Sequence, residues 1–370
     1  MTDIIRYENL TFPEVAALPR DIPIVIPLGE MTEAELIKRA QRRARSAFAL
    51  DRMCVLPSVP FGFGGSALVV DRKVFKRVID SLAASLEEDG FTNVMVLKTS
   101  RRVQNLREVT ANHVALVATG HTEQHAFHLP LNTDTLIIDA IARGVEAKMP
   151  ATIWRLPAFP YGVSMHRRQY PGTVTIDPRA WEDFWVEMVG LLHARGLRRA
   201  YLINGHGGNH SFLVNVTKFC GDRWPDMFVA TSFLHTTSAE LQKYRTSPVG
   251  GMGHACELET SYILHLRPDL VHMERAVDEV NFTATPNYYM DWIEGGALIA
   301  NPPWTDDTIS GAYGAGTQAT AEKGRLWLAA AIEEKVGHVQ EIIEQQRRRE
   351  ERRAEGWTLG AWRKAVFPVA

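Results

Sequence analysis

Short apolar runs alternate with longer amphipathic segments along most of this chain. Runs rich in aliphatic residues predict buried strands, and they lie at Pro23–Leu28, Met53–Leu56, Val94–Leu97, Val114–Ala118, Thr152–Leu156 and Arg199–Ile203. Apolar residues at helical spacing predict helices, which lie at Thr32–Phe48, Arg72–Asp89, Thr135–Glu146, Pro178–Arg195 and Ala321–Arg353. Strands that alternate with helices are typical of α/β proteins, so we expect an α/β architecture with a mainly parallel sheet.

The predicted helix at 178–195 carries a broad apolar stripe. The stripe consists of Trp181, Phe184, Trp185, Met188, Leu191 and Leu192. Aromatic residues at this spacing could line a ligand site or pack against a sheet. Packing is the usual role of such a stripe, because helices dock on sheets through it. We therefore interpret these residues as part of the core.

The composition is that of an ordinary soluble protein. Of 370 residues, 45% are hydrophobic and 23% are charged, and the net charge of −2 offers no basic field for nucleic acid. The cysteines, Cys54, Cys220 and Cys256, are too scattered for a disulfide framework. No apolar run approaches the ~18 residues that span a bilayer, and no secretory leader is visible. We expect a cytoplasmic protein with neither a nucleic-acid nor a membrane partner.

Residues 121–134 concentrate side chains that bind divalent metals. The segment contains His121, Glu123, His125, His128 and Asp134, which offer imidazole nitrogens and carboxylate oxygens. It follows the predicted strand at 114–118, and open α/β sheets present their active sites just past strand ends. The segment therefore predicts a metal site, and hydrolysis is the chemistry that such sites commonly perform.

Two later segments offer further ligands. Asn204-Gly205-His206-Gly207-Gly208-Asn209-His210 follows a predicted strand, and its glycines let the backbone turn tightly around His206. The segment 253–261 contains His254, Glu257 and Glu259. Each pattern is weak alone. Ligands arriving from three separate segments are typical of hydrolytic metal centres.

These segments, taken in order, resemble the creatininase (creatinine amidohydrolase) family. The resemblance rests on Glu123-Gln124-His125, Leu129–Asp134, Asn204–Asn209 and His254–Ser261, with support from Tyr170–Thr173 and Ala319–Gly324. It spans about 105–345 and implies a three-layer α/β/α fold. We expect an N-terminal α/β module at 1–105, a creatininase-like metal-dependent hydrolase domain at 106–345 and a C-terminal tail at 346–370.

The resemblance implies a dinuclear amidohydrolase that uses Zn²⁺ or Mn²⁺, sometimes Fe²⁺. One metal would be held by Glu123 and His206, the other by His125 and Glu257, with Asp134 between them. A hydroxide bridging the two metals would attack an amide carbonyl, and His254 would pass a proton to the departing nitrogen. The predicted substrate-binding residues are Ser164, His166 and Tyr170. The resemblance also implies a homo-oligomer, namely a hexamer built from dimers.

The substrate is less well indicated than the metal. Creatininase has a Glu at the position of Gly208, a Glu at that of Gly253 and a Trp at that of Gly250. Without that Trp we do not expect creatinine as the substrate. Our first hypothesis is cleavage of a small cyclic or lactam-like amide. The alternatives are a peptide or formamide hydrolase and a metal-binding pseudoenzyme with a structural role.

Neighbouring polar residues have other interpretations. We expect His121 and His128 to surround the ligands, since the family ligands already saturate the centre. We interpret His210 as a helix cap and Glu259 as a residue that orients a neighbour or caps a turn. Cys256 is an inert small residue, a thiolate ligand or an oxidation-sensitive position.

An earlier part of the chain repeats the pattern without the ligands. Leu56–Gly62 (LPSVPFG) reappears as Leu156–Gly162 (LPAFPYG). We interpret 20–100 and 112–210 as two copies of one unit, although β/α units also look alike by chance. In this alignment Thr32, Ala34 and Ser100 take the places of the ligands Glu123, His125 and His206. The first copy would then be a structural or regulatory module without metal.

Overall fold

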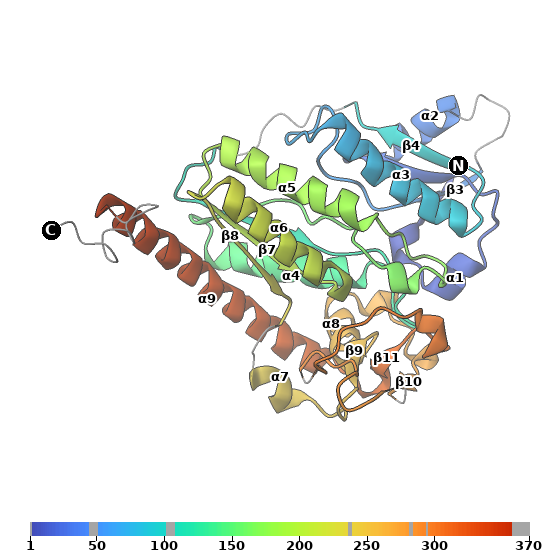
Figure 1. Cartoon of the computed structure of the whole chain (residues 1–370). Coiled ribbons are helices and arrows are strands. Elements are labelled where there is room, and N and C mark those ends of the chain that lie inside the picture. Colours follow the sequence, from blue (N-terminus) through green and yellow to red (C-terminus); the bar gives the residue numbers. More distant parts are fainter. Residues whose placement is uncertain are drawn as a thin grey trace.

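The computed structural model describes residues 2–43, 51–100, 108–235, 239–280, 284–293 and 295–356. In chain order its strands and α-helices are β1 (Asp3–Arg6), α1 (Phe12–Ala16), β2 (Ile24–Leu28), α2 (Glu33–Arg43), β3 (Arg52–Val55), α3 (Arg72–Glu88), β4 (Val94–Lys98), β5 (Val114–Thr119), α4 (Thr133–Lys148), β6 (Ile153–Arg155), α5 (Pro178–Ala194), β7 (Arg199–Asn204), α6 (His210–Arg223), β8 (Phe228–Phe233), α7 (Ala239–Tyr244), β9 (Met252–His254), α8 (Glu257–Leu266), β10 (Asp278–Glu279), β11 (Tyr313–Ala315) and α9 (Ala321–Ala354) (Figure 1). Every strand and helix predicted from the apolar pattern is present, and the ends that fall on described residues agree within two positions.

The described residues form three sheets. Two are four-stranded and parallel throughout, with the strand orders β1-β3-β2-β4 and β6-β5-β7-β8. The third is a small antiparallel sheet, β10-β11-β9, which lies with α7 and α8 at the base of the molecule in Figure 1. The prediction of a mainly parallel α/β fold is confirmed.

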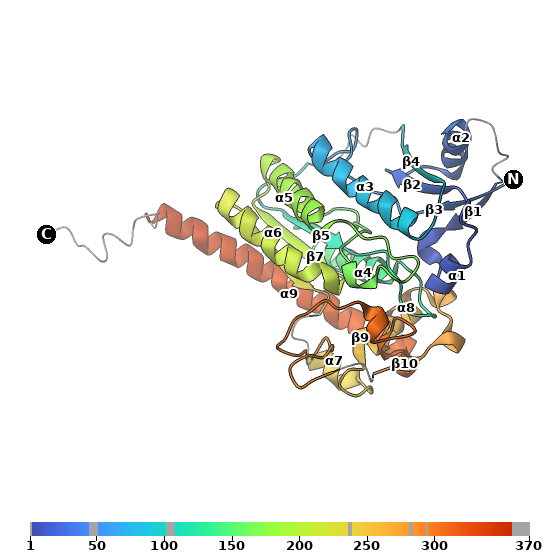
Figure 2. The same cartoon turned by 45° about the vertical axis from the view of Figure 1, so that its right-hand side comes forward.

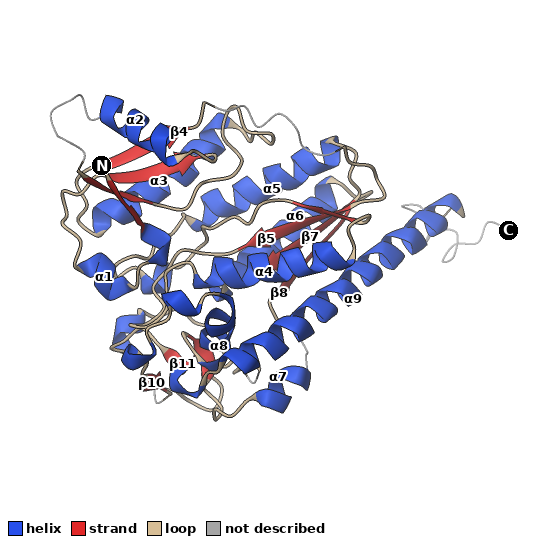
Figure 3. Cartoon of the chain, turned by 180° about the vertical axis from the view of Figure 1, so that it is seen from behind, coloured by secondary structure: helices blue, strands red, loops and turns tan. Residues whose placement is uncertain are grey.

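The sheet that carries β5 and β7 is buried on both faces. Val117 and Leu202 pack in one hydrophobic cluster with residues of α5, whereas Leu116 and Ile203 pack in another with residues of α4 and α9. Successive side chains of a strand point to opposite faces, so this division places helices on each side. Figure 3 shows the same arrangement, with α5 and α6 on one side of the strands and α4 and α9 on the other. This is the expected three-layer α/β/α arrangement.

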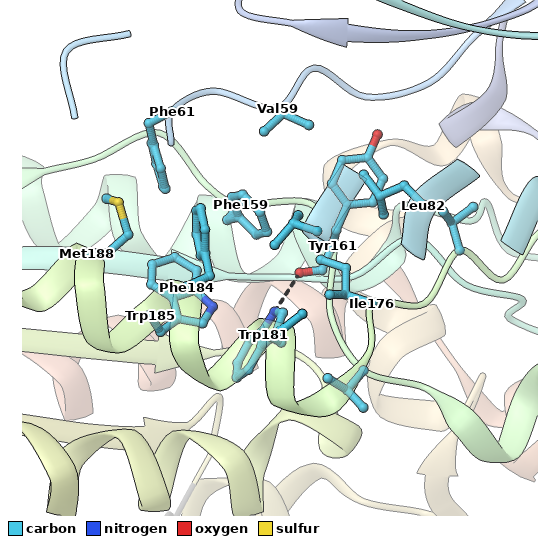
Figure 4. Packing of buried hydrophobic residues seen from close by; sticks show 14 of the residues in the cluster. Val59, Phe61, Leu82, Phe159, Tyr161, Ile176, Trp181, Phe184, Trp185 and Met188 are labelled. Carbon is cyan, nitrogen blue, oxygen red and sulfur yellow. Dashed lines mark hydrogen bonds between the residues drawn. The ribbon is translucent and has the colours of Figure 1, made fainter. Parts of the chain in front are cut away.

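The aromatic stripe of α5 is part of the core, as predicted (Figure 4). Trp181, Phe184 and Trp185 are at most 1% exposed. Phe61, from the N-terminal unit, lies 5.6 Å from Phe159 and 6.3 Å from Phe184 between ring centroids. Each such pair contributes about 0.5–1.5 kcal/mol beyond area burial. The N-terminal sheet and the β5–β8 sheet therefore share one hydrophobic core.

The N-terminal unit repeats the backbone of the following unit. The order β2-α2-β3-α3-β4 matches β5-α4-β6-α5-β7, and the strands adjoin in the same way, as β3-β2-β4 and β6-β5-β7. The amide of Gly29 donates to the Val59 carbonyl at 2.9 Å, as the amide of Gly120 does to the Phe159 carbonyl. These matches support two copies of one unit. The predicted boundary between 105 and 106 lies outside the described residues.

In the N-terminal unit, the residues aligned with Glu123 and His206 stabilise helix α2 instead of binding a metal. The hydroxyl of Thr32 accepts a hydrogen bond from the Glu35 amide at 3.3 Å. The amide and hydroxyl of Ser100 both donate to the Glu35 carboxylate, at 2.9 and 2.8 Å. Both residues thus stabilise the start of α2, an ordinary role for short hydroxyl side chains.

The sequence predicted no membrane span, no disulfide framework and a separate C-terminal tail. Among the described residues, no helix is both long and apolar enough to cross a membrane. Cys54, Cys220 and Cys256 are buried and carry free thiols. The predicted tail begins as a continuation of α9 to Ala354, and its last part, 357–370, lies outside the described residues. Figure 2 shows α9 running along the outside of the molecule.

Asp89 links the N-terminal unit to the loop between β6 and α5. We expect this residue to make the stability of the protein depend on pH. Its carboxylate accepts a hydrogen bond from the Gly172 amide at 2.8 Å, and burial raises the pKa of Asp89 to about 6. Because the folded state holds this proton more firmly than the unfolded chain does, stability falls as pH rises from about 4 to 6. Asp89→Asn should remove about 1–3 kcal/mol of that loss. Urea unfolding at pH 4, 5, 6 and 7 measures it, and parallel pH profiles for both proteins would contradict it.

Candidate metal centre

The candidate site lies where β5 and β7 end. The loop after β5 carries Glu123 and His125, and the loop after β7 carries His206. Asn204 shapes the second loop, because its side chain accepts from the His206 amide at 3.1 Å and donates to the His206 carbonyl at 2.7 Å. Asn209 closes the motif by donating to Asn204 at 3.2 Å. The asparagines of the Asn-Gly-His-Gly-Gly-Asn motif therefore fix the direction of the histidine.

Two glycines in this motif are required by close packing. A Cβ on Gly205 would lie 2.6 Å from the Asp134 carbonyl, and a Cβ on Gly208 would lie 2.1 Å from the Val163 carbonyl. Real Cβ atoms do not approach backbone oxygens so closely. The Val163 carbonyl has a task of its own, since it accepts a hydrogen bond from Nε2 of His206 at 3.0 Å. Gly208 thus makes room for the group that orients the imidazole.

Glu123, Asp134 and His206 form the first donor set. Because Nε2 of His206 donates to a carbonyl, its Nδ1 carries the lone pair. That Nδ1 lies 3.0 Å from Oε1 of Glu123 and 3.1 Å from Oδ2 of Asp134. Oδ2 of Asp134 is buried and has no hydrogen-bond partner. Three electron-rich atoms converging in a buried place fit a cation between them.

His125, Asp134 and Glu259 form the second donor set. The ring of His125 donates from Nδ1 to the Glu123 carbonyl at 3.1 Å, so its Nε2 lone pair faces Oδ1 of Asp134 at 3.2 Å. Donor atoms of His125, Asp134 and Glu259 all lie within 4.8 Å of one another. Asp134 belongs to both sets, as expected for a carboxylate between two metals. The predicted ligands Glu123, His125, Asp134 and His206 are all brought together.

The structure does not bring Glu257, which was predicted as a ligand, into either donor set. Its carboxylate accepts hydrogen bonds from the amides of Thr246 and Ser247, at 3.0 and 2.9 Å, and pairs with Lys323 at 2.5 Å. Residues two apart on a helix lie about 200° apart around its axis. Since α8 begins at Glu257, only one of the two glutamates can face the cluster, and it is Glu259. Glu257 instead ties α8 to the start of α9.

His254, the predicted proton carrier, lies at the cluster beside Glu123 and His125. Its Nε2 donates to the Gln124 carbonyl at 2.8 Å, which leaves the Nδ1 lone pair facing inward. Nδ1 lies 3.7 Å from Oε1 of Glu123 and 3.9 Å from Oε2 of Glu259. Burial lowers the pKa of His254 well below its usual value, and Arg167 adds to this effect. The imidazole is therefore held neutral, with its lone pair on Nδ1.

His121 and His128 surround the ligands, as expected. The Gly162 amide donates to Nδ1 of His121 at 2.8 Å, so Nε2 of His121 carries the proton and has no lone pair for a metal. His128 shares a hydrogen bond with the Thr260 hydroxyl at 2.9 Å. His210 is exposed at the first position of α6, and the N-cap position of that helix is taken by Asn209.

The predicted substrate-binding residues divide into three cases. The Ser164 hydroxyl donates to Oε2 of Glu123 at 2.7 Å, so Ser164 contacts the cluster directly. His166 packs on Trp304 with 4.9 Å between ring centroids. The Tyr170 hydroxyl donates to the Thr308 carbonyl at 2.6 Å. The contacts of Tyr170 do not support a substrate role, because they commit its hydroxyl to holding the loop that carries Trp304.

Two site residues were missed by the sequence analysis, namely Arg167 and Trp304. Arg167 ends a short 3₁₀ helix (Met165–Arg167), is 1% exposed and forms an ion pair with Glu123. Trp304 begins another 3₁₀ helix (Trp304–Asp306), and its ring covers the Arg167 guanidinium at 3.7 Å and lies 5.2 Å from His254. An arginine next to other basic residues and a distant tryptophan carry no motif. Only the fold reveals them.

Creatininase has a Trp at the position of Gly250. In this chain the aromatic ring at the cluster is that of Trp304. Gly250 lines a separate cavity of about 330 Å³ with Val249, Val280 and Tyr289, and none of the donor residues lines that cavity. Burial raises the pKa of the Cys256 thiol well above its usual value. A thiol of this kind stays protonated, which agrees with the inert alternative.

The sequence comparisons agree with this geometry. The profile of the creatininase family (creatinine amidohydrolase) matches residues 97–339. The chain belongs to the creatininase family. A relative named mycofactocin precursor peptide peptidase, from Mycobacterium tuberculosis, is 32% identical over 60% of this chain and 83% of its own length. The 3-dehydro-scyllo-inosose hydrolase of Thermotoga maritima is 28% identical over 62% of this chain and 77% of its own length.

The creatininase fold is also found by structural comparison. A creatininase structure with Mn superposes with a TM-score of 0.53 at 24% identity, over 62% of this chain and 91% of its own. This similarity establishes the fold. The family match leaves out residues 1–96, so most of the first copy lies outside it. The chain is therefore a hydrolase of the creatininase family. The names of its relatives point to different substrates.

Proposed function

We propose that this protein is a metal-dependent amidohydrolase that holds two divalent cations, Mn²⁺ or Zn²⁺. Glu123, Asp134 and His206 would bind one ion, and His125, Asp134 and Glu259 the other. The observation that carries the proposal is the unpartnered, buried Oδ2 of Asp134, with the His206 lone pair 3.1 Å away. When bound, the ions would supply Lewis-acid activation of water and of the substrate carbonyl.

The residues around the donor sets would orient the ligands and transfer protons. The Gln124 carbonyl holds the His254 ring through Nε2. The opposite nitrogen, Nδ1, would accept a proton from the attacking water and return it to the leaving nitrogen. Ser164 fixes the carboxylate of Glu123 by its hydrogen bond. The Trp304 ring packs against His254 at the edge of the cluster. The presence of His254 beside the donor sets supports an active enzyme over a pseudoenzyme.

The substrate proposed first is a small cyclic or lactam-like amide. A peptide bond is the second candidate, and it is favoured by the printed name of the mycobacterial relative, a precursor peptide peptidase. Both need a C–N bond beside the same donor sets, so the chemistry is shared. A homo-oligomer, with a hexamer as the specific form, is part of the same proposal and rests on the family resemblance.

The proposal predicts about two ions per chain and turnover of an amide that depends on them. Purified protein would be stripped with a chelator, reloaded with Mn²⁺ or Zn²⁺ and analysed by mass spectrometry of the metals. Lactams, hydantoins, formamides and short peptides would then be assayed with and without metal. Binding of about two ions without hydrolysis of any amide would contradict the enzymatic part, and the absence of stoichiometric metal would contradict the whole.

A further inference from the structure

Arg167 is a buried cation whose hydrogen-bonding capacity is mostly unused. Its guanidinium has five N–H donors. Within the described part of the chain its hydrogen-bond partner is the Glu123 carboxylate alone, and its Nε is buried without any partner. Leaving donors of a charged group buried and unpaired costs free energy. The arrangement is therefore one that an additional anionic acceptor would complete.

Trp304 fixes the plane of this guanidinium. The indole ring covers its face at 3.7 Å, and the same indole packs against Tyr313, with 4.1 Å between ring centroids. A covered face leaves the edge of the guanidinium to make hydrogen bonds in its own plane. The edge matches the two oxygens of a carboxylate, which accept a pair of parallel bonds from arginine.

The charge around Arg167 favours an anion once the metals of the proposed function are present. Glu123, Asp134 and Glu259 supply the carboxylates of the cluster. Two divalent cations exceed these three negative charges, and Arg167 adds another positive charge beside Glu123. The site would then attract a negatively charged substrate.

We propose that Arg167 binds the carboxylate of the substrate, so that the amide cleaved here carries a carboxylate beside its scissile bond. This inference rests on the proposed function and narrows its substrate to carboxylate-bearing amides. Arg167 contacts Glu123, a ligand of the first donor set. A carboxylate held by Arg167 would therefore place a neighbouring amide next to the donor atoms, as positioning for hydrolysis requires.

Matched probes can test this inference without any turnover. Pyroglutamate and N-acetylglycine carry a carboxylate, and their primary amides are neutral molecules of nearly the same shape. Calorimetric titration of the metal-loaded wild type should give at least about tenfold tighter binding of the carboxylate member, since a truncated charge pair usually costs more than this. Arg167→Met should lose most of this preference, because only the excess charge of the metals then remains, and Arg167→Lys should keep a larger part of it.

Arg168 supplies the control, because it is the next residue and forms its ion pair with Glu88 at the surface. Arg168→Met should bind the probes as the wild type does. Metal content and melting temperature of each variant show whether it is folded and loaded. If Arg167→Met is unstable, the Lys variant decides.

Three results would overturn the inference. The first is no carboxylate preference in the wild type, including no binding of either member. The second is a preference that is as large in both Arg167 variants as in the wild type. The third is an equal loss of both probes together with metal, which would make Arg167 a positioning residue for Glu123. Failure of the proposed function would look different, because carboxylate binding would persist while no amide is hydrolysed.

Discussion

Glu259→Gln is expected to lower metal affinity by more than about 100-fold and to abolish metal-dependent turnover, whereas Glu257→Gln should keep both. Loss of groups that merely orient ligands already costs 10–100-fold, so loss of an anionic ligand should cost more. The carboxylate of Glu259 lies in the donor set with His125 and Asp134. Chelator competition and metal analysis measure affinity, and an amide assay measures turnover.

The two substitutions form a matched pair, because both remove one charge from the same turn of α8. Glu257→Gln should lose the ion pair with Lys323, and we expect it to cost about 1–3 kcal/mol of stability. Thermal unfolding in the presence of chelator would measure that cost apart from metal binding. If the Glu257 variant lost its metal and the Glu259 variant kept it, our ligand assignment would be reversed.

His206→Ala is expected to reduce turnover to the background level and to release one of the two ions. Its Nδ1 lies between carboxylate oxygens of Glu123 and Asp134, at 3.0 and 3.1 Å. No neighbouring side chain can replace it, because Nε2 of His121 carries a proton. Metal analysis and the amide assay check the result.

His210→Ala is the control for this substitution, since His210 lies four residues later and is exposed. We expect it to keep most of the activity and the full metal content. Equal and complete loss of turnover in the two variants would show that the loop needs both rings for its shape. It would also remove the reason for assigning His206 as a ligand.

The parts of the fold that the sequence predicted well are those where local pattern and burial agree. β5 and β7 are buried on both faces, and their continuous apolar runs identified them within one residue. β8 was missed, because most of its residues are only partly buried and its sequence, Phe-Val-Ala-Thr-Ser-Phe, is mixed. The antiparallel strands β9, β10 and β11 are too short for any period to show.

The candidate site shows where sequence reasoning ends. Glu123, His125, Asp134 and His206 follow strand ends or lie in marked loops, so their convergence could be predicted. The choice between Glu257 and Glu259 depends on the residue at which α8 begins, and a segment with two glutamates does not reveal that. Arg167 and Trp304 meet only because the fold brings residues 137 positions apart together.

The shared aromatic core also restricts how copies of this chain can assemble. Phe61 and its neighbours cover the side of α5 that bears Phe184, and that side is already fully used within one chain. In a shorter chain without the N-terminal unit, this apolar face of α5 would be exposed to water or would contact another subunit. Here the N-terminal unit already covers this face, so a contact between subunits would have to use another surface.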